Sequence, residues 1–399
     1  MLHGFLFRFF RMTKNMRFSI ILAKLAYLVY FLKYLMRRIR CRKKIVRISK
    51  EDALAIIKKD YQPPTQRPEY NNTQADDSID LSIIVPVYNY VDLIDNNISS
   101  ILNQKTDYKF ELIIVDDGST DGAQDVVRKY ANEPNVKAIF QKNKGIAGAR
   151  NTGLENACGK YIMFVDCDDT VEDNIVDVLM KRAYKDDCDI VMCAHNLVKE
   201  RNGEIYETVP NVYPDCDMLG YAKDAKILNY AGLPWCKVYK RELWQNIRYF
   251  PGFWYEDNII HSLVFPQCEK FAYEPVICYQ YRWYEKNFSH TQSASSRNSK
   301  CMDAYWIMLP ILERYDELGY EKGDLFETML LKHLSLYYYN TVSGLNNETV
   351  EALFSLACDL YEEYGVKENC KLPYMLKVTK RALLTRDINL WKLASQYQK

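Results

Sequence analysis

Three groups of acidic and polar side chains follow short apolar runs of the sequence and could bind a charged ligand. Asp166, Asp168 and Asp169 lie within four residues of one another, at the end of the apolar run KYIMFV. Clustered carboxylates repel one another unless a cation neutralises them, and oxygen ligands of this kind favour Mg²⁺ or Mn²⁺. Because such ions commonly bridge to phosphates, the cluster is a candidate metal site that faces a phosphorylated substrate.

The two other groups offer contacts for a base or a sugar. Pro86, Tyr88 and Asn89 follow the run LSIIV and combine a rigid turn with an aromatic face on which a base can stack. Asp116 and Asp117 follow the run ELIIV, and their carboxylates can accept hydrogen bonds from a base N–H or a sugar hydroxyl. An Asp-Gly turn by itself is more often only a turn. All three groups in order, at successive strand ends, favour a nucleotide site.

Strands and helices alternate through this part of the sequence, which places the three groups on one sheet. Apolar runs at 81–87, 111–117, 136–141 and 160–166 predict strands, and apolar residues at helical spacing predict a helix at 91–102. This alternation predicts an α/β fold with a mainly parallel sheet flanked by helices. Ligands of such sheets bind at the carboxyl ends of the strands, so the strand-end residues are expected to form one site.

Five separated segments together resemble family 2 of the glycosyltransferases, whose members have a GT-A type fold. The segments are SIIVPVYN, IIVDDGSTDG, NKGIAGARNTGLENACGKYIMFVDCDD, WCKVYKRELW and EDN, in this order within residues 81–290. The resemblance is to the type that builds bacterial surface polysaccharides. It implies inverting transfer of a sugar from a nucleotide-diphosphate sugar, with UDP favoured, assisted by Mn²⁺ or Mg²⁺.

The resemblance also implies roles for the matching residues on the donor side. Asp166 would lie toward the ribose, and Arg150 would support the carboxylate that binds the base. By position alone, Arg150 could equally form an ion pair that touches no ligand. Asp168 would hold the metal, with Asp169 and His290 as further candidates. The expected donor-binding residues are Pro86, Tyr88, Asn89, Asp116, Asp117, Lys144, Gly145, Arg150, Asp166 and Arg282.

The general base is expected further along the chain. The resemblance makes Asp257 the carboxylate that takes the proton of the acceptor hydroxyl, from the face opposite the leaving diphosphate. Without the resemblance, the pair Glu256-Asp257 would more simply complement the start of the helix predicted after it. Trp235 and Lys237 lie in a segment that resembles the Trp-x-Lys-Leu-Tyr segment of the family. They are expected, with Glu256, on the acceptor side.

The first fifty residues differ in charge from the rest of the chain. They carry 14 Lys and Arg and no Asp or Glu, whereas the whole chain has 53 basic and 52 acidic residues. Within them, Phe18 to Met36 is apolar apart from Lys24 and Lys33. The two lysines and the basic flanks favour an amphipathic helix on an anionic membrane surface over a spanning helix. A helix packed on the rest of the protein is a further alternative.

Composition predicts the domain organisation and the location. The four expected parts are a basic, membrane-associating helical arm at 1–60, a linker at 61–80, the glycosyltransferase domain at 81–299 and a helical subdomain at 300–399. Residues 81–190 would bind the nucleotide sugar, and 191–299 would bind a glycan or lipid-linked acceptor. The acidic body argues against nucleic acid as a partner. Scattered cysteines without C-x-x-C spacing are typical of a reducing compartment, so we expect the cytoplasmic face of the cell membrane, or else the cytoplasm.

Two other functions stay open from the sequence. A sugar nucleotidyltransferase would need a Gly- and Lys/Arg-rich triphosphate loop after the first strand, and the segment PVYNYVDL has neither feature. A non-catalytic nucleotide-sugar-binding relative is the second alternative. It would have no need of Asp166, Asp168 and Asp257, which are all present.

Overall fold

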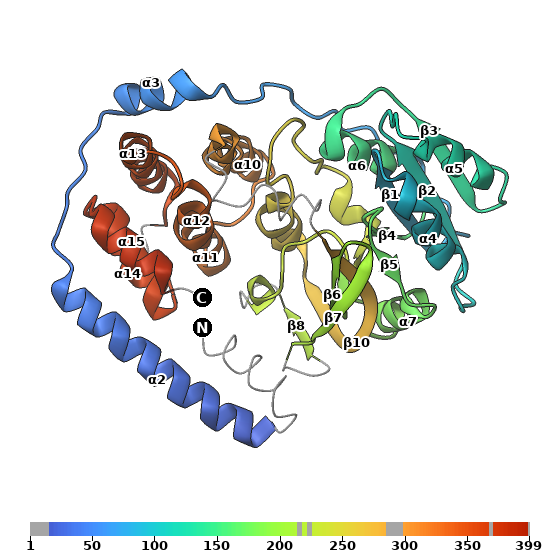
Figure 1. Cartoon of the computed structure of the whole chain (residues 1–399), viewed down its shortest axis with the longest axis horizontal. Helices are drawn as coiled ribbons and strands as arrows, with labels where there is room; N and C mark the ends of the chain where they lie inside the picture. Colours follow the sequence, from blue (N-terminus) through green and yellow to red (C-terminus); the bar gives the residue numbers. More distant parts are fainter. Residues whose placement is uncertain (1–15, 214–217, 222–225, 285–297, 367–369, 398–399) are drawn as a thin grey trace. The chain divides into compact units, whose positions relative to one another are not determined.

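The chain folds into two compact units. A computed structural model describes residues 16–213, 218–221, 226–284, 298–366 and 370–397. One unit consists of Met1–Pro63 and Phe288–Lys399 and is called the helical unit here; the other, Pro64–Asn287, is called the sheet unit. In Figure 1 the helical unit is blue at one end of the chain and orange to red at the other, and the sheet unit runs from blue through teal and green to gold.

Ten described strands form one sheet in the sheet unit. Their order is β3-β2-β1-β4-β9-β6-β10-β5, with β7 paired to β6 and β8 paired to β10. The strands are β1 (Leu81–Val87), β2 (Phe110–Asp116), β3 (Val136–Phe140), β4 (Tyr161–Phe164), β5 (Thr170–Val171), β6 (Ile190–Arg201), β7 (Glu204–Asn211), β8 (Met218–Tyr221), β9 (Lys237–Lys240) and β10 (Lys270–Trp283).

The first half of the sheet is parallel, as the alternation of strands and helices predicts. β3, β2, β1 and β4 pair in parallel. All seven residues of β1 are buried, which explains why all but Ser82 are apolar, because a strand covered on both faces has no solvent-exposed side. The second half is mixed: β9 is antiparallel to β4 and β6, and β10 is parallel to β6 but antiparallel to β5 and β8.

Helices connect the parallel strands and cover the sheet. They are α4 (Val91–Leu102), α5 (Ala123–Tyr130), α6 (Gly145–Asn156) and α7 (Ile175–Asp186), with short turns η2 (Lys226–Asn229), η3 (Arg241–Trp244), η4 (Ile260–Val264) and η5 (Phe265–Gln267). The apolar faces of α4 and α7, including Ile98 and Leu179, share one core with the strands. The helix predicted after Asp257 corresponds to the helical stretch that contains η4 and η5.

The segment expected as a linker is attached to the sheet unit over most of its length. Residues 64–80 contain no helix or strand, yet they belong to the sheet unit. The buried guanidinium of Arg248 donates to the Asn71 carbonyl and, at 2.8 Å, to the Asn72 side chain. Arg241 donates to the Thr73 carbonyl at 2.9 Å. These contacts fix the segment on the body instead of leaving it as a free connection.

The helical unit combines both ends of the chain, and its C-terminal part is the predicted helical region. Its elements are α2 (Met16–Arg40), α3 (Lys50–Asp60), η7 (Ser299–Met302), α9 (Asp303–Trp306), α10 (Met308–Glu317), α11 (Asp324–Lys332), η8 (His333–Tyr337), α12 (Tyr338–Val342), α13 (Asn347–Tyr364), α14 (Tyr374–Leu384) and α15 (Ile388–Gln396). No helix within the described ranges combines the length and the apolar character needed to cross a bilayer. The cysteines of those ranges form no disulfide bond.

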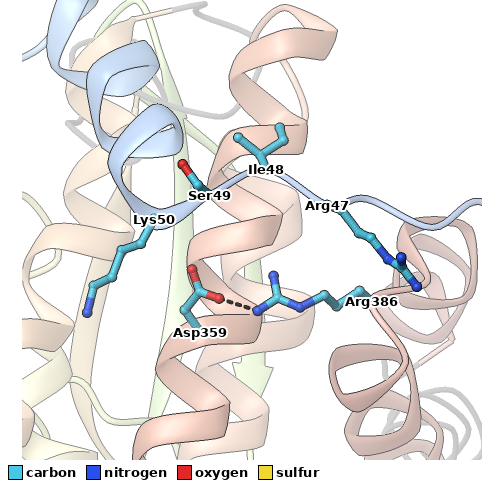
Figure 2. A pocket seen from close by; sticks show the side chains of 6 residues that line it. All are labelled: Arg47, Ile48, Ser49, Lys50, Asp359 and Arg386. Atoms are coloured by element: carbon cyan, nitrogen blue, oxygen red, sulfur yellow. Dashed lines mark hydrogen bonds and ion pairs between the residues drawn. The ribbon is translucent and has the colours of Figure 1, made fainter.

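Residues 41–60, which we expect in a separate arm, are part of the packed helical unit. α3 lies along α13, and Ala53 and Ile57 of α3 are fully buried. Ile45 forms a β-bridge with Asp387 just before α15. A pocket of about 510 Å³ at this junction is lined by Arg47, Ile48, Ser49, Lys50, Asp359 and Arg386 (Figure 2). Arg386 pairs with Asp359 there, and the pocket contains none of the predicted site residues.

Candidate active site

Three strand ends bring the sequence motifs together at one edge of the sheet. β1 and β2 are adjacent and end in register, with Val87 opposite Asp116, so that Tyr88 and Asp117 leave the sheet side by side. The Asp117 N–H donates to the Val87 carbonyl at 2.8 Å. β4 lies on the other side of β1 and ends two residues before Asp166. The parallel pairing therefore gathers the three groups, as the strand-end argument predicts.

Asp116 organises the turn after β2. Oδ1 of its buried carboxylate accepts hydrogen bonds from the Gly118 N–H at 3.1 Å, the Ser119 N–H at 3.0 Å and Gln124 Nε2 at 2.9 Å. Gly118 has a φ of +79°, and a Cβ there would lie 3.1 Å from the Asn143 amide nitrogen, so the turn requires glycine. Oδ2 of Asp116 is buried without a hydrogen-bond partner in the described part of the chain. Asp116 thus shapes the turn with one oxygen and keeps the other unpaired.

Asp117 connects the end of β2 to the start of α6. Its Oδ1 accepts hydrogen bonds from Gln141 Nε2 at 2.6 Å and from the Lys144 backbone N–H at 2.8 Å. Burial raises the pKa of Asp117, and these hydrogen bonds oppose the rise. α6 begins at Gly145, which adopts a φ of +74°. Lys144 is exposed.

Tyr88 presents an exposed ring at the same edge. Pro86 lies within β1, and the Tyr88 ring just beyond the strand is 46% exposed. Asn89 adopts a φ of +59°, and its side-chain oxygen accepts a hydrogen bond from the Thr120 N–H at 2.7 Å. This bond holds the loop after β1 against the loop after β2. The arrangement suits a planar base stacked on Tyr88.

Arg150 joins the two halves of the site. Its side chain is 3% exposed, with Nη2 at 2.9 Å from Asp166 Oδ1 and Nη1 at 2.6 Å from Glu256 Oε1. It also lies over the Tyr249 ring, 5.3 Å from the ring centre. Burial opposes the charge of Arg150, but the two carboxylates outweigh it and raise its pKa. Arg150 therefore pairs with Asp166 and Glu256, and not with the base-side carboxylate Asp117 that the family resemblance implies.

Asp166 and Asp168 are the partly exposed carboxylates of the acidic cluster. Oδ2 of Asp168 accepts a hydrogen bond from the Tyr284 hydroxyl at 3.1 Å. Burial, followed by the charge of Asp166, raises the pKa of Asp168 to about 6. A bound cation relieves such repulsion, and Mg²⁺ is commonly held by one or two carboxylates plus phosphate oxygens, so the pair fits a metal on a diphosphate. In the described ranges, no three His, Cys, Asp or Glu side chains converge as a metal site; His290 lies outside those ranges.

Asp169 and Arg282 have partners inside the protein. Asp169 is 1% exposed, and its two oxygens accept hydrogen bonds from the Tyr279 hydroxyl at 2.7 Å and the Arg282 N–H at 2.8 Å. Burial raises the pKa of Asp169. The guanidinium of Arg282 pairs with Glu200 on β6, with Nε at 3.1 Å from Oε2. These contacts fit a supporting role for Asp169 better than direct contact with a metal.

Asp257 follows a strained turn beside the same charges. Tyr255 adopts a φ of +62°, which is unusual for a bulky residue, and Glu256 then binds Arg150. Burial raises the pKa of Asp257 to about 7; the charges of Glu256 and Asp166 add to the rise, and Arg150 opposes it. A carboxylate with a pKa near the operating pH suits a general base. Asp257 thus shares an electrostatic environment with the acidic cluster.

Trp235 and Lys237 are more deeply buried than an acceptor-facing position implies. Trp235 is 4% exposed, and its ring stacks between Tyr279 at 4.9 Å and Tyr281 at 5.0 Å. The Lys237 ammonium donates to the Trp235 carbonyl at 3.2 Å and to the carbonyl of residue 233 at 2.8 Å. Burial lowers the pKa of Lys237 to about 8, and the charge of Asp257 partly offsets this. Lys237 thus holds the turn before β9.

Two tyrosines of the site were missed by the sequence motifs. Tyr284 donates to Asp168, and the Tyr279 hydroxyl, which donates to Asp169, accepts the Asp166 N–H at 3.2 Å. Tyr279 lies three residues before Arg282, which the resemblance includes among the donor-binding residues, but the resemblance gave the Tyr279 ring no role. No sequence motif pointed to Tyr284. Its hydrogen bond to Asp168 depends on the pairing of β10 with β5, the strand that follows the acidic cluster.

Comparison with known proteins finds similar glycosyltransferases. Residues 82–248 match the model of glycosyl transferase family 2. The chain is 29% identical over 244 residues to the uncharacterized glycosyltransferase YibD of Escherichia coli (strain K12), which covers 59% of this chain and 70% of that protein. It is 28% identical over 297 residues to glycosyltransferase GlyA of Streptococcus pneumoniae serotype 4. This alignment covers 72% of this chain but only 40% of that protein.

A solved structure has a similar fold. The crystal structure of S. aureus TarS 1-349 in complex with UDP-GlcNAc aligns with a TM-score of 0.52 at 18% sequence identity. The alignment covers 80% of this chain and 91% of that one. At this identity the likeness concerns the fold alone. Residues 82–248 are therefore similar to glycosyl transferase family 2, and the fold of the chain is of the GT-A type.

Proposed function

We propose that this chain is an inverting glycosyltransferase that moves a hexosyl group from a UDP-sugar to a hydroxyl of a glycan or lipid-linked acceptor. The observation that carries the proposal is the Arg150 bridge, because one buried guanidinium contacts both Asp166 of the acidic cluster and Glu256 beside Asp257. A nucleotide sugar as donor is supported by the fold neighbour that was solved with UDP-GlcNAc.

Asp257 is the proposed general base. The acceptor oxygen forms a bond to the anomeric carbon while its proton passes to the Asp257 carboxylate. The bond from that carbon to the diphosphate breaks, and its electron pair leaves with the nucleoside diphosphate, which inverts the configuration. A pKa of about 7 leaves Asp257 ionised above neutral pH and still basic enough to share the proton.

Asp168 and Asp166 are the proposed holders of Mn²⁺ or Mg²⁺, and their repulsion is the feature that a cation would relieve. Such an ion, when bound, stabilises negative charge on a leaving diphosphate, so that no separate acid is needed. Tyr284 orients Asp168 through its hydroxyl, and Arg150 fixes the direction of Asp166. Tyr88 and Asp117 are the proposed contacts of the base.

The proposed setting is polysaccharide biosynthesis at the cytoplasmic face of the cell membrane. Support comes from the first fifty residues, whose 14 basic side chains are unaccompanied by any Asp or Glu. Positive charge of this density is attracted to the anionic lipids of the cytoplasmic leaflet. An acceptor carried on a lipid would be found at the same surface.

A donor panel tests the proposal. The full chain is incubated with UDP-, GDP- and dTDP-sugars and Mn²⁺, and the released nucleoside diphosphate is measured. We expect release of UDP from a UDP-sugar, and we expect chelation of the metal to abolish it. The control Asp77→Asn, at an exposed residue, should release UDP like the wild type. Release from no donor would overturn the assignment as an active transferase. Release of pyrophosphate from UTP and a sugar phosphate would instead identify a nucleotidyltransferase.

A further inference from the structure

One side of α2 is an apolar stripe that faces solvent. Its members recur every three or four residues, which places them on one face of the helix, over about a third of its circumference. Their side chains are 36% to 85% exposed: Ile21, Leu25, Leu28, Val29, Leu32, Leu35, Met36 and Ile39. Contiguous apolar exposure of this kind, unlike single exposed leucines, marks an interaction surface.

The opposite side of α2 is fixed to the helical unit by aromatic residues. Tyr34 is buried in a small core with residues of α14 and α15, and Phe31 packs against the edge of Tyr374 at 5.7 Å. The Tyr30 hydroxyl donates to the Gln396 carbonyl at 2.8 Å. Figure 1 shows α2 alongside α14 and α15. These contacts set the rotation of α2, so the apolar stripe faces away from α14 and α15.

Positive charges border the stripe. By the 3.6-residue repeat, Lys24 falls on one edge of the stripe, and Lys33 and Arg40 fall on the other. No Asp or Glu occurs among the first fifty residues. A bilayer that contains anionic lipids matches both features, because lysine and arginine reach the head groups while the apolar side chains enter the acyl region. A second copy of this chain would instead bring like charges together along the contact.

We propose that α2 lies in the plane of an anionic bilayer surface, with its apolar stripe inserted and its aromatic side held by α14 and α15. The inference deepens the proposed function and rests on it for the acceptor, which would be met at the membrane surface. Vesicle binding itself needs no sugar transfer. The two proposals can therefore fail separately.

Sedimentation of the full chain with vesicles tests the surface. Binding is compared between vesicles of phosphatidylcholine alone and vesicles that also contain phosphatidylglycerol. We expect the chain to bind the anionic vesicles, and we expect added salt to weaken this binding. The variant that combines Leu25→Glu with Leu32→Glu should bind these vesicles about tenfold more weakly or worse. The matched control is Ile205→Glu with Leu219→Glu, two exposed apolar residues of the sheet unit, and it should bind like the wild type. Circular dichroism confirms folding of each variant.

Two results would overturn the proposal. One is equal vesicle binding by the wild type and by the Leu25→Glu, Leu32→Glu variant. The other is a wild type that binds no vesicles and is a dimer by light scattering, with the Leu25→Glu, Leu32→Glu variant monomeric. That outcome would assign the stripe to contact with a second copy of the chain. Loss of donor hydrolysis with vesicle binding intact would count against the proposed function alone.

Depth measurements separate a helix in the surface plane from one that spans the bilayer. Tryptophan is introduced singly at Ile21, Leu28 or Leu35, and quenching by brominated lipids is measured above the wild-type background. An in-plane helix gives the same shallow depth at all three positions. A depth that changes steadily along the helix would show a spanning orientation and overturn the proposal.

Discussion

Arg150 divides the carboxylates of the site into two kinds. It pairs with Asp166 in the acidic cluster and with Glu256 beside the proposed base. The neighbouring carboxylates, Asp168 and Asp257, are not direct partners of Arg150, and burial raises their pKa values to about 6 and about 7. Environments that separate the pKa values of nearby acids commonly assign them different roles. Arg150 thus orients one acid of each motif, while Asp166 and Asp168 together remain the proposed holders of the cation.

Removal of the proposed base tests the role of Asp257. Asp257→Asn keeps the shape of the side chain but cannot take a proton, so we expect kcat to fall about 10²–10⁴-fold. Donor affinity, measured by calorimetric titration with UDP, should stay close to that of the wild type. Turnover near the wild-type rate would exclude Asp257 as the base.

The same substitution has a predicted effect on stability that depends on pH. Folding raises the pKa of Asp257 from 3.8 to about 7, so the protonated form favours the folded state. The protonated carboxyl makes its full contribution to the free energy of unfolding below the pKa that Asp257 has in the unfolded chain. This contribution is lost as the pH rises through about 7. Asp257→Asn should therefore melt at a higher temperature than the wild type at about pH 8, with a smaller difference toward about pH 4. Thermal unfolding followed by circular dichroism measures the melting temperatures of both proteins at each pH. A difference in melting temperature that does not change with pH would contradict the prediction.

Loss of the Arg150 bridge should affect both stability and turnover. Arg150→Met leaves Asp166 and Glu256 without their cation, and breaking a buried pair costs about 3–5 kcal/mol in the free energy of unfolding. Arg150→Lys keeps the positive charge but lacks the planar guanidinium that contacts both carboxylates at once. Compared with Arg150→Met, it should therefore restore more of the free energy of unfolding than of kcat. Denaturant unfolding and donor hydrolysis are compared with Arg128→Met, an exposed control. Equal recovery of both properties would argue against a positioning role.

At the scale of elements, two segments distant in sequence, β10 and α4, hold the acidic cluster and the strand that follows it. β5 follows the cluster directly and pairs with β10, Thr170 opposite Gln280 and Val171 opposite Tyr279. Asn97 on α4, a buried residue, donates from its amide to the carbonyls of Asp166 at 3.0 Å and of Asp169 at 2.8 Å. The loop is thereby fixed from two sides, which orients its carboxylates before any ligand arrives.

Asn97 provides the test of this support. Asn97→Ala removes a donor from a buried and a partly buried carbonyl, and the expected loss in the free energy of unfolding is about 1–3 kcal/mol. UDP-sugar binding in the presence of Mn²⁺ should weaken because Asp168 is no longer held in place. Asn96→Ala, on the exposed side of the same helix, is the matched control and should change neither quantity. Unchanged donor binding in Asn97→Ala would show that the loop keeps its shape without this contact.

At the scale of the whole molecule, the two ends of the chain fold together. Lys44 pairs with Glu351, and the Ser355 hydroxyl of α13 donates to the Ile48 carbonyl at 2.8 Å. With α3 buried against α13, removal of the first sixty residues would uncover an apolar surface of the helical unit. Such a truncation therefore measures loss of folding as well as any loss of membrane binding, which is why the vesicle experiment uses substitutions on α2.

Ile57 tests whether α3 belongs to the core. Ile57→Ala in this fully buried position should lower the free energy of unfolding by about 2–5 kcal/mol, as a cavity in a packed core does. Ile56→Ala on the same helix, where the side chain is only partly buried, should lose clearly less. Equal losses in chemical denaturation would mean that α3 does not pack on α13 as described.

The sequence by itself determined the elements and the strand ends. The runs at 81–87, 111–117, 136–141 and 160–166 correspond to β1 to β4 within a few residues, because a mainly apolar run bounded by turn residues is a local property of a strand in a covered sheet. Parallel pairing then brings the ends together without further information, which is why the three motifs of the candidate site could be predicted to meet.

Only the tertiary structure decided which partners the side chains take. The sequence could not show that Arg150 contacts Glu256, that both oxygens of Asp169 are used inside the protein, or that Trp235 is enclosed by Tyr279 and Tyr281. It also could not show that residues 41–60 pack with the C-terminal helices. Periodicity reports which face of an element avoids water, whereas a partner is chosen by contacts between segments far apart in the chain, and those exist only once the elements are packed.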